Sequence, residues 1–306
     1  MPVSLSPVPF VRDFDFAHGR PDRLSPLVTR VIAPNPGPFT FTGSGTYLVG
    51  DEAGCAVIDP GPRDEGHADA VMAAAPGPVT MILVTHTHSD HCGGTDLLRA
   101  RTDAPVLAYG AHPSPPGGAS PALDEGADHG FRPDREVEDG ERVTLPSCDL
   151  VAVHTPGHIV NHLCFALEAE GALFTGDHVM GWATTVVAPP DGDMADYMRS
   201  LDVLAGRDDR TYYPTHGAPI TDPGPFVAAV RAHREARDAA ILASLADGPL
   251  TPDQIVERVY AGLDPGLRFA AALNVTAHLA MHEGPEHEGS GDGARVARRG
   301  EAYALA

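Results

Sequence analysis

The segment from Thr85 to Gly94, Thr-His-Thr-His-Ser-Asp-His-Cys-Gly-Gly, places four metal-ligand side chains within six positions: His86, His88, Asp90 and His91. The run from Met81 to Val84 before it has the length and apolar composition of a buried strand. Polar groups at the carboxyl end of such a strand lie where α/β proteins place their sites. Because imidazole and carboxylate together suit a catalytic zinc ion, the segment predicts a metal site.

Three further β-rich runs, 150–153, 172–175 and 211–214, lead into residues of the same kind. The ligand candidates after them are His158, Asp177 and His216. Separate strand ends can converge on one cleft. Five histidines and two aspartates are too many for one tetrahedral ion, and they suit two ions roughly 3.5–4 Å apart with a carboxylate between them. The sequence therefore predicts a dinuclear centre.

The pattern His-x-His-x-Asp-His resembles the signature of the metallo-β-lactamase fold superfamily. That resemblance implies an α/β fold, a four-layer αββα sandwich. It also implies that one ion is bound by His86, His88 and His158, and the other by Asp90, His91 and His216, with Asp177 bridging them. The Asp59-Pro60-Gly61 turn resembles the superfamily's first short motif, which implies that Asp59 supports the ligands without binding metal.

Residues 35–43, 176–181 and 213–217 resemble the lactamase-β-like protein 2 branch of this superfamily. In that branch the tail after the last ligand is a small winged helix. We therefore expect a catalytic domain over 1–225 and a winged-helix-like domain over 226–306. One departure is Ile159, which follows His158 where members of the branch carry Thr or Ser.

Composition restricts the partners. Acidic residues number 42 against 21 basic ones, for a net charge of −21. Such a surface repels long polyanions, so nucleic acid is an unfavourable partner, although single-stranded RNA, the substrate that the branch implies, stays open. No apolar run approaches the ~20 residues that span a bilayer, and the first residues do not resemble a signal peptide. We expect a cytoplasmic protein without a membrane partner, and a homodimer stays open.

The remaining sequence predicts the elements that surround the site. We expect an irregular Pro-rich arm over 1–30 that packs on the body, and a hairpin over 46–59. Helices are expected over 64–75, 91–101, 226–246 and 267–282, with one more beginning at Thr251-Pro252 and a Gly-rich wing over 284–303. Loops at 110–130 and 183–195 are expected near the cleft.

Bound zinc would lower the pKa of water from ~15.7 to ~7 and so supply a metal-bridging hydroxide as the nucleophile. Asp90 and Asp177 would hold and orient that hydroxide. His162 and His178 lie beside ligands in the sequence, and each could protonate a leaving group or support a ligand. Zinc, two ions per chain, is the expected metal, and iron or manganese stays open.

The sequence thus predicts a dinuclear zinc hydrolase of a small acyl substrate: an ester, a thioester, a lactone or, weakly, a lactam. Two alternatives stay open. One is a metal-dependent endoribonuclease that cleaves single-stranded RNA, and the other is a non-catalytic metal-binding module with a winged helix. The acidic balance favours the small-molecule substrate over RNA.

Overall fold

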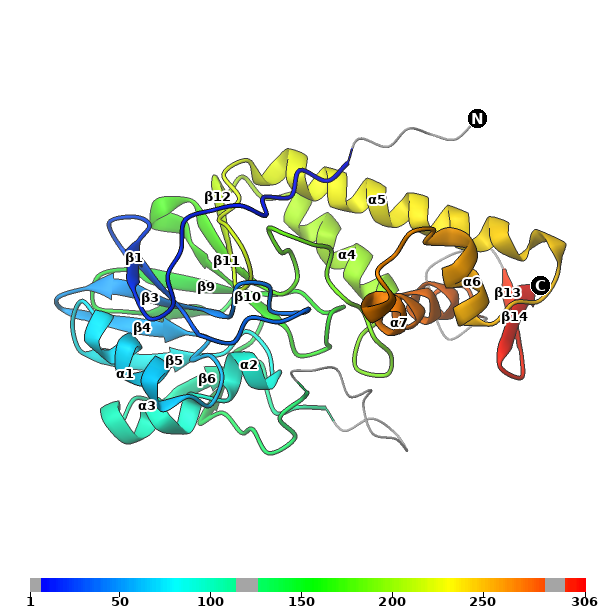
Figure 1. The fold of residues 1–306 in the computed structure, drawn as a ribbon. Helices are drawn as coiled ribbons and strands as arrows, with labels where there is room; N and C mark the ends of the chain where they lie inside the picture. Colours follow the sequence, from blue (N-terminus) through cyan, green and yellow to red (C-terminus); the bar gives the residue numbers. More distant parts are fainter. Residues whose placement is uncertain (1–6, 114–125, 284–294) are drawn as a thin grey trace.

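The computed structural model describes residues 7–113, 126–283 and 295–306. Two mixed sheets form its centre (Figure 1). The first sheet has the order β1-β2-β3-β4-β5-β6-β7: Pro21–Arg23, Val28–Ile32, Gly45–Asp51, Gly54–Ile58, Val79–Leu83, Val106–Ala108 and Arg135–Glu136. The second has the order β12-β11-β10-β9-β8: Thr211–Pro214, Ala172–Gly176, Leu163–Leu167, Asp149–His154 and Arg142–Thr144.

Successive side chains of a strand point to opposite faces of its sheet, so each sheet contributes to two layers of the core. Tyr47 and Ile58 of the first sheet pack with Phe165 and Phe174 of the second in one cluster between the sheets. Their neighbours on the same strands point outward. Leu48 and Val57 belong to a cluster that packs on two helices, α1 (Glu65–Ala74) and α3 (Thr95–Thr102).

The second sheet is covered in the same way by α4 (Met194–Ala205) and α5 (Pro223–Ser244). Cys164, Leu173 and Tyr212 point away from the first sheet and pack with Leu201 of α4 and Phe226 of α5. The order of layers is therefore helix, sheet, sheet, helix, which confirms the predicted αββα sandwich (Figure 1).

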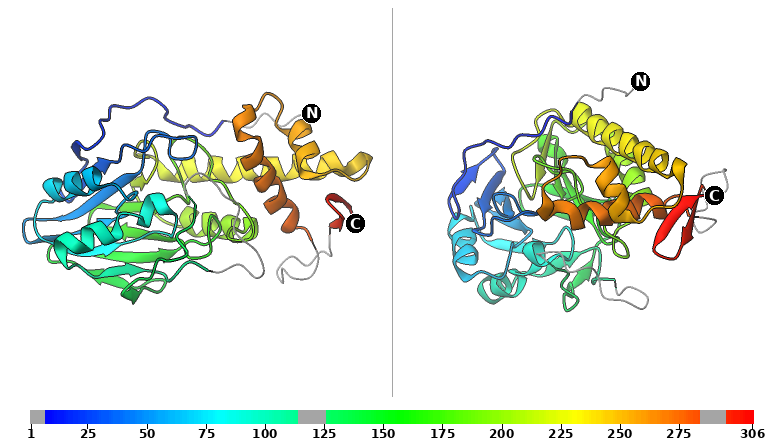
Figure 2. Two further views of the ribbon diagram at one scale, coloured as in Figure 1. Left: turned by 60° about the horizontal axis from the view of Figure 1, so that its bottom comes forward. Right: turned by 45° about the vertical axis from the view of Figure 1, so that its right-hand side comes forward.

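The C-terminal region forms a second, smaller core. Helix α5 extends from the sandwich into this region, where it meets α6 (Pro252–Val259), α7 (Arg268–Ala280) and the hairpin of β13 (Val296–Arg299) and β14 (Ala302–Leu305) (Figure 2). Ile241, Ile255, Val275 and Tyr303 lie in one cluster there. The described residues also contain short 3₁₀ turns at Glu168–Glu170, Leu245–Asp247 and Pro265–Leu267. The predicted boundary at residue 225 falls within α5, and the division into two domains stays a prediction.

Two predicted elements differ from the structure. The arm does pack on the body, since the rings of Phe10 and Phe226 meet edge-to-face with their centroids 5.9 Å apart. It is not irregular throughout, because β1 and the first residues of β2 lie within 1–30. The helix predicted over 91–101 is instead two helices, α2 (Ser89–Cys92) and α3, separated by a turn at Gly93 and Gly94. Glycine is the poorest helix former after proline, which explains the interruption. Most of the predicted loop at 110–130, and part of the wing at 284–303, lie outside the described residues.

Among residues 7–113, 126–283 and 295–306, no helix combines the length and the apolar character needed to cross a membrane.

Candidate metal centre

The structure brings all seven predicted ligand residues to one edge of the sandwich. His86 and His88 follow β5, and Asp90 and His91 lie in α2 directly after them. The other three follow strands of the second sheet: His158 comes after β9, Asp177 after β11 and His216 after β12. These strands run in the same direction, since β9 and β11 are each antiparallel to β10, and β11 is parallel to β12. Their carboxyl ends therefore meet.

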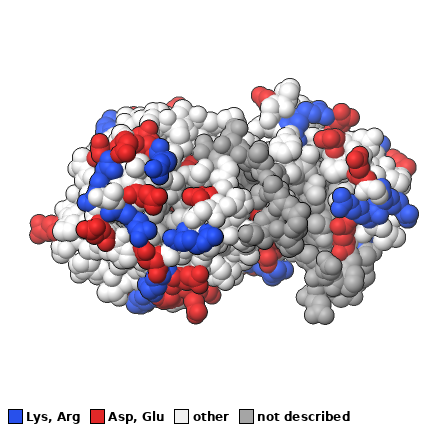
Figure 3. All heavy atoms as spheres, turned by 90° about the horizontal axis from the view of Figure 1, so that it is seen from below, with Lys and Arg blue, Asp and Glu red and all other residues white. Residues whose placement is uncertain are grey.

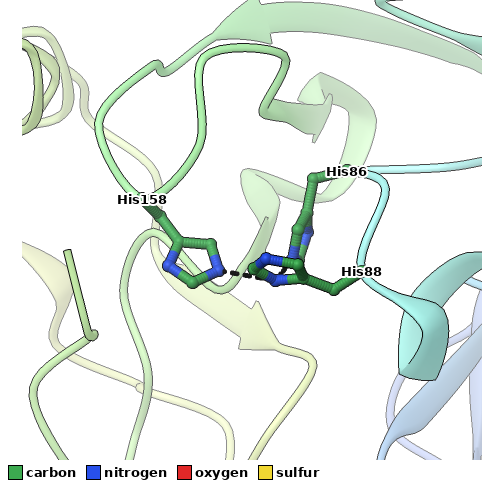
Figure 4. Close-up of side chains that lie close together, drawn as sticks. All are labelled: His86, His88 and His158. Carbon is green, nitrogen blue, oxygen red and sulfur yellow. Dashed lines mark hydrogen bonds between the residues drawn. The ribbon is translucent and has the colours of Figure 1, made fainter. Parts of the chain in front are cut away.

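Three imidazoles form the first group. The Nε2 atom of His86 lies 2.9 Å from Nδ1 of His88, and Nε2 of His158 lies 3.1 Å from the same Nδ1. Figure 4 shows the three rings converging from two separate loops. Burial, reinforced by His158, lowers the pKa of His88 to about 3, and burial also holds the pKa values of His86 and His158 below the ordinary value. The rings are therefore neutral at pH 7, which is the form that binds a metal ion.

Asp90, His91 and His216 form the second group. Oδ2 of Asp90 lies 3.3 Å from Nε2 of His91 and 3.2 Å from Nε2 of His216. Two ligands placed about 2.1 Å from a tetrahedral zinc ion are separated by about 3.4 Å, so these spacings suit a shared ion. Burial opposes ionisation of Asp90, but His91 and His216 outweigh it and lower its pKa to about 2. Asp90 is therefore ionised, which is the form in which a carboxylate binds a metal ion.

Asp177 connects the two groups. Its Oδ1 lies 3.6 Å from Nε2 of His91 and 3.4 Å from Nε2 of His216, whereas its Oδ2 lies 3.8 Å from Nε2 of His158. Burial raises the pKa of Asp177, but His216 and His91 oppose this effect and hold the pKa well below its usual range. One carboxylate oxygen thus faces each group, which is the arrangement a bridging ligand requires.

Two buried atoms show that the centre fits cations. Nε2 of His91 and Oδ1 of Asp177 are buried and have no hydrogen-bond partner. Leaving such a group unpaired costs roughly 1–3 kcal/mol. Burial lowers the pKa of His91, but Asp90, Asp177 and Asp59 together raise it well above the ordinary value. The surroundings of His91 therefore stabilise a positive charge. A divalent ion would supply that charge and would also provide a partner for Nε2 of His91 and Oδ1 of Asp177.

Asp59 holds the second group in place, as its predicted supporting role requires. Its Oδ1 accepts a hydrogen bond from the backbone N–H of Thr85 at 2.8 Å. Its Oδ2 accepts from the hydroxyls of Thr85 and Thr215, at 2.8 and 3.0 Å, and lies 2.8 Å from Nδ1 of His91. This contact fixes the proton of His91 on Nδ1 and leaves Nε2 facing the centre.

Other supporting contacts were not predicted. The hydroxyl of Ser44 donates to Oδ2 of Asp90 at 2.9 Å. The backbone carbonyl of Val186 lies 2.7 Å from Nδ1 of His158, so that ring also presents Nε2 to the centre. Gly157 places His158: it has φ of 139°, and a Cβ there would lie 2.3 Å from Cα of Tyr197. Only glycine fits this turn without distortion.

His162 lies on the side of the predicted ligands that faces away from the cavity over the centre. The backbone N–H of Asp177 donates to its Nε2 at 3.2 Å, so its proton is on Nδ1, 2.8 Å from the Thr155 hydroxyl. Burial holds its pKa well below the ordinary value. Both ring nitrogens are thus engaged, which favours its predicted supporting role over its predicted proton-donating role.

His178 is also buried, and its ring packs on that of Tyr197 at a centroid distance of 4.6 Å. Burial, with His158 and Arg234, lowers its pKa to about 3. Neither His162 nor His178 is among the described residues that line the cavity above the centre. A proton-donating role for His178 stays a prediction.

A cavity of about 70 Å³ lies over the centre and exposes His88, Asp90, His158, Asp177 and His216. Its walls come from the described part of the loop at 110–130, from the loop at 183–195, from the segment before β3 and from Met180: Phe39, Thr40, Gly126, Ala127, Met180, Val186, Ala188 and Asp191. The loops at 110–130 and 183–195 therefore do reach the cleft, as predicted.

Comparison with known proteins places this arrangement in a family. The Metallo-beta-lactamase superfamily model matches residues 40–216, which contain all seven ligand residues. The Beta-lactamase associated winged helix domain matches residues 251–280, over α6 and α7.

Two curated relatives resemble most of the chain. An atrochrysone carboxyl ACP thioesterase from Aspergillus chevalieri is 33% identical over 78% of this chain and 74% of its own. A beta-lactamase-like protein 2 homolog from Caenorhabditis elegans is 32% identical over 83% of each chain.

Solved structures agree on the fold. A metallo-beta-lactamase family protein from Thermus thermophilus superposes with a TM-score of 0.73, at 24% identity over 92% of this chain and 100% of its own. A beta-lactamase domain protein from Burkholderia ambifaria superposes with a TM-score of 0.74, at 23% identity over 96% of each chain. With its complete set of His and Asp ligand residues, this chain belongs to the metallo-β-lactamase superfamily, as a metal-dependent hydrolase with a C-terminal winged helix.

Proposed function

We propose that this protein is a dinuclear zinc hydrolase that cleaves acyl thioesters. The observation that carries the proposal is the convergence of seven ligand residues beneath a small cavity whose other walls are mostly apolar. Relatives named as thioesterases support the choice of bond. When bound, two zinc ions supply a water of lowered pKa and polarise the substrate carbonyl.

The residues of the chain hold that chemistry in place. Asp90 and Asp177 are ionised and line the cavity over the centre, so they would accept hydrogen bonds from an attacking water and orient it. Asp59 and the Val186 carbonyl fix His91 and His158 with Nε2 inward. Preorganised ligands of this kind avoid reorganisation during the reaction.

The leaving group distinguishes a thioester from an amide. A thiol has a pKa near 8.5, so a thiolate can depart without first receiving a proton. An amine leaving group needs a general acid. Among the described residues that line the cavity, the only histidines are the predicted ligands His88, His158 and His216. The site therefore suits a substrate whose leaving group needs no acid.

RNA is the rival substrate, and charge opposes it. No arginine is among the described residues lining the cavity over the centre. Figure 3 shows arginines on one face of the molecule lying among acidic side chains rather than in a continuous positive patch. Arg101, for example, pairs with Glu65 and Asp69, and Arg99 pairs with Asp134. Tight binding of a polyanion requires unpaired positive charge along its path.

The test compares substrates on one zinc-loaded sample. Acetyl and phenylacetyl thioesters of N-acetylcysteamine, an activated ester, a chromogenic lactam and labelled single-stranded RNA would be assayed in parallel. We expect thioester hydrolysis that disappears with chelator and falls at least 10³-fold in Asp90→Ala. Asp96→Ala, at an exposed position on α3, is the matched control and should retain activity. RNA cleavage lost in Asp90→Ala, without acyl turnover, would contradict the proposal.

A further inference from the structure

A second cavity, of about 200 Å³, lies between the sandwich and the winged helix. We call it the interdomain cavity. One wall is the segment before β3 together with the loop after Asp177, and the other is formed by α7 and the segment that connects α6 to it. Its lining residues are Pro38, Phe39, Met180, Trp182, Ala183, Thr184, Val186, Tyr260, Leu263, Leu267, Ala270, Ala271 and Asn274.

The interdomain cavity adjoins the cavity over the metal centre. Phe39, Met180 and Val186 line both of them. The carbonyl of Val186 also lies 2.7 Å from Nδ1 of His158, so a residue that lines both cavities contacts one of the predicted ligand residues. A molecule bound at the centre can therefore extend across these three side chains into the interdomain cavity.

Its walls are suited to an uncharged, apolar occupant. None of the described residues that line it is charged, and three of them are aromatic: Phe39, Trp182 and Tyr260. The side chain of Asn274 is already engaged: its Oδ1 accepts from the backbone N–H of Val187 at 3.0 Å, and its Nδ2 donates to the carbonyl of Ala270 at 3.1 Å. The indole Nε1 of Trp182 is buried without a hydrogen-bond partner, so in the described part of the lining it is the one donor of this kind that an occupant could satisfy. The ring of Trp182 is held parallel to that of Phe41 at 4.7 Å.

We propose that the interdomain cavity binds the apolar acyl group of the substrate while the thioester carbonyl lies at the metal centre. This inference rests on the proposed thioesterase function and adds the class of acyl group. An apolar cavity of about 150 Å³ in a protein core accommodates benzene, so about 200 Å³ suits a ring-sized group. A phenylacetyl group would bury its ring here, whereas an acetyl group ends at the metal centre and gains nothing from the cavity.

The first test narrows the cavity from each wall. Ala270→Leu places a larger side chain on α7, and Ala183→Leu does so on the partly exposed opposite loop, where the risk of misfolding is small. Each should lower kcat/KM for the phenylacetyl thioester at least tenfold, equivalent to about 1.4 kcal/mol, and for the acetyl thioester less than threefold. Ala240→Leu, at an exposed position on α5, is the matched control and should change neither value.

The second test measures binding without hydrolysis. Trp182 is the only tryptophan in the chain and lines the interdomain cavity, so its fluorescence reports occupancy directly. Chelator-treated protein would be titrated with the 4-nitrobenzyl thioether of N-acetylcysteamine, which is neutral and cannot be hydrolysed. We expect saturable quenching in the native protein and in Ala240→Leu, and at least tenfold weaker binding in Ala270→Leu and Ala183→Leu.

The outcomes separate the two proposals. Suppose that thioesters are hydrolysed, but both cavity variants keep the native preference for the phenylacetyl over the acetyl thioester. If the thioether also quenches their Trp182 fluorescence as it does in the native protein, the interdomain cavity does not bind the acyl group. In that case the proposed function stands. If quenching is saturable and weakened by both variants but no thioester is hydrolysed, the cavity stands as an apolar ligand site and the proposed function falls.

Discussion

Asp59 shows how much of the centre depends on a residue that does not face it. Its two oxygens contact the backbone N–H and the hydroxyl of Thr85, the hydroxyl of Thr215, and His91. Replacing it with Asn leaves one acceptor oxygen where two are used. Because loss of a partner behind a metal ligand weakens binding 10- to 100-fold, we expect Asp59→Asn to weaken binding of the second zinc ion by about that factor.

This prediction is checked by competition with a chromogenic chelator, which resolves the two binding steps. The first ion, bound by His86, His88 and His158, should be affected less than threefold. Equal weakening of both steps, or of neither, would contradict the role assigned to Asp59.

His67 predicts a pH dependence of stability. It is buried, Nε2 lies 2.8 Å from the Thr46 hydroxyl, and burial lowers its pKa to about 4. Between the unfolded pKa of about 6.5 and the folded value, the unfolded chain binds a proton that the folded chain excludes. The stabilisation is therefore complete above about pH 6.5 and is lost as the pH falls toward 4, by up to about 3 kcal/mol.

Urea unfolding of chelator-treated protein across this pH range provides the measurement. The variant His67→Asn keeps a polar side chain near Thr46 but does not titrate. Its free energy of unfolding should fall less steeply with acid than that of the native protein, by up to about 3 kcal/mol over the range. Parallel curves for the two proteins would exclude His67 as the cause.

At the scale of elements, the loop after Asp177 connects the winged helix to the metal centre. Arg234 of α5 donates to the carbonyl of Thr185, whose hydroxyl donates to the carbonyl of Asp177. Asn274 of α7 accepts from Val187, and the adjacent Val186 carbonyl positions His158. Two helices of the C-terminal region thus hold the loop that orients two ligand residues.

We therefore expect Asn274→Ala to weaken zinc binding about tenfold, because the Val187 N–H loses its acceptor and the loop loosens around His158. Thr276→Ala is the matched control. The Thr276 hydroxyl bonds only within α7, to the carbonyl of Ala272, so its loss should leave zinc affinity unchanged. Equal affinities in both variants would show that α7 does not support the centre.

The sequence predicts the strands that lead into the candidate ligand residues, because such strands are apolar runs that end in His or Asp. Apolar runs ending in His or Asp predicted β5, β9, β11 and β12 and the meeting of their carboxyl ends. The same reasoning gave no prediction for β2, β7 or β10, and it missed β1, because the Pro-rich arm over 1–30, which includes Pro21, suggested irregular chain. Proline is tolerated there because β1 is the edge strand of its sheet.

The supporting contacts could not be predicted in the same way. The carbonyl of Val186 positions His158, but every residue type carries a carbonyl, so the sequence holds no signal for it. Ser44 approaches Asp90 from 46 positions away, and the order of β3, β4 and β5 in the first sheet brings the start of β3 to the same edge as the end of β5. The interdomain cavity likewise depends on how α7 docks beside the loop after Asp177, which is a property of the tertiary structure.

For the whole molecule, metal content is the decisive quantity. Seven ligand residues in two groups predict two zinc ions per chain. Binding that is restricted to the folded state adds about 4 kcal/mol of stability at a thousandfold excess over Kd, which raises Tm by on the order of 10 °C. Elemental analysis after zinc loading should give two equivalents, and thermal unfolding with and without chelator should show the shift. One equivalent, or no shift, would contradict the dinuclear centre.

The cluster beneath the second sheet has a consequence for biosynthesis. It contains Leu173 and Tyr212 from the sheet, Phe226 and Val230 from α5, and Ala277 from α7. During translation α4 can cover part of this face as the sheet emerges, but the part that packs on α5 stays uncovered until residue 230 has left the ribosome, and the edge that Ala277 covers stays so until α7 is made. The nascent chain must therefore protect an apolar surface while the winged helix is still being made. A stop codon shortly after His216 would release all seven predicted ligand residues on a sandwich whose second outer layer keeps α4 and lacks α5.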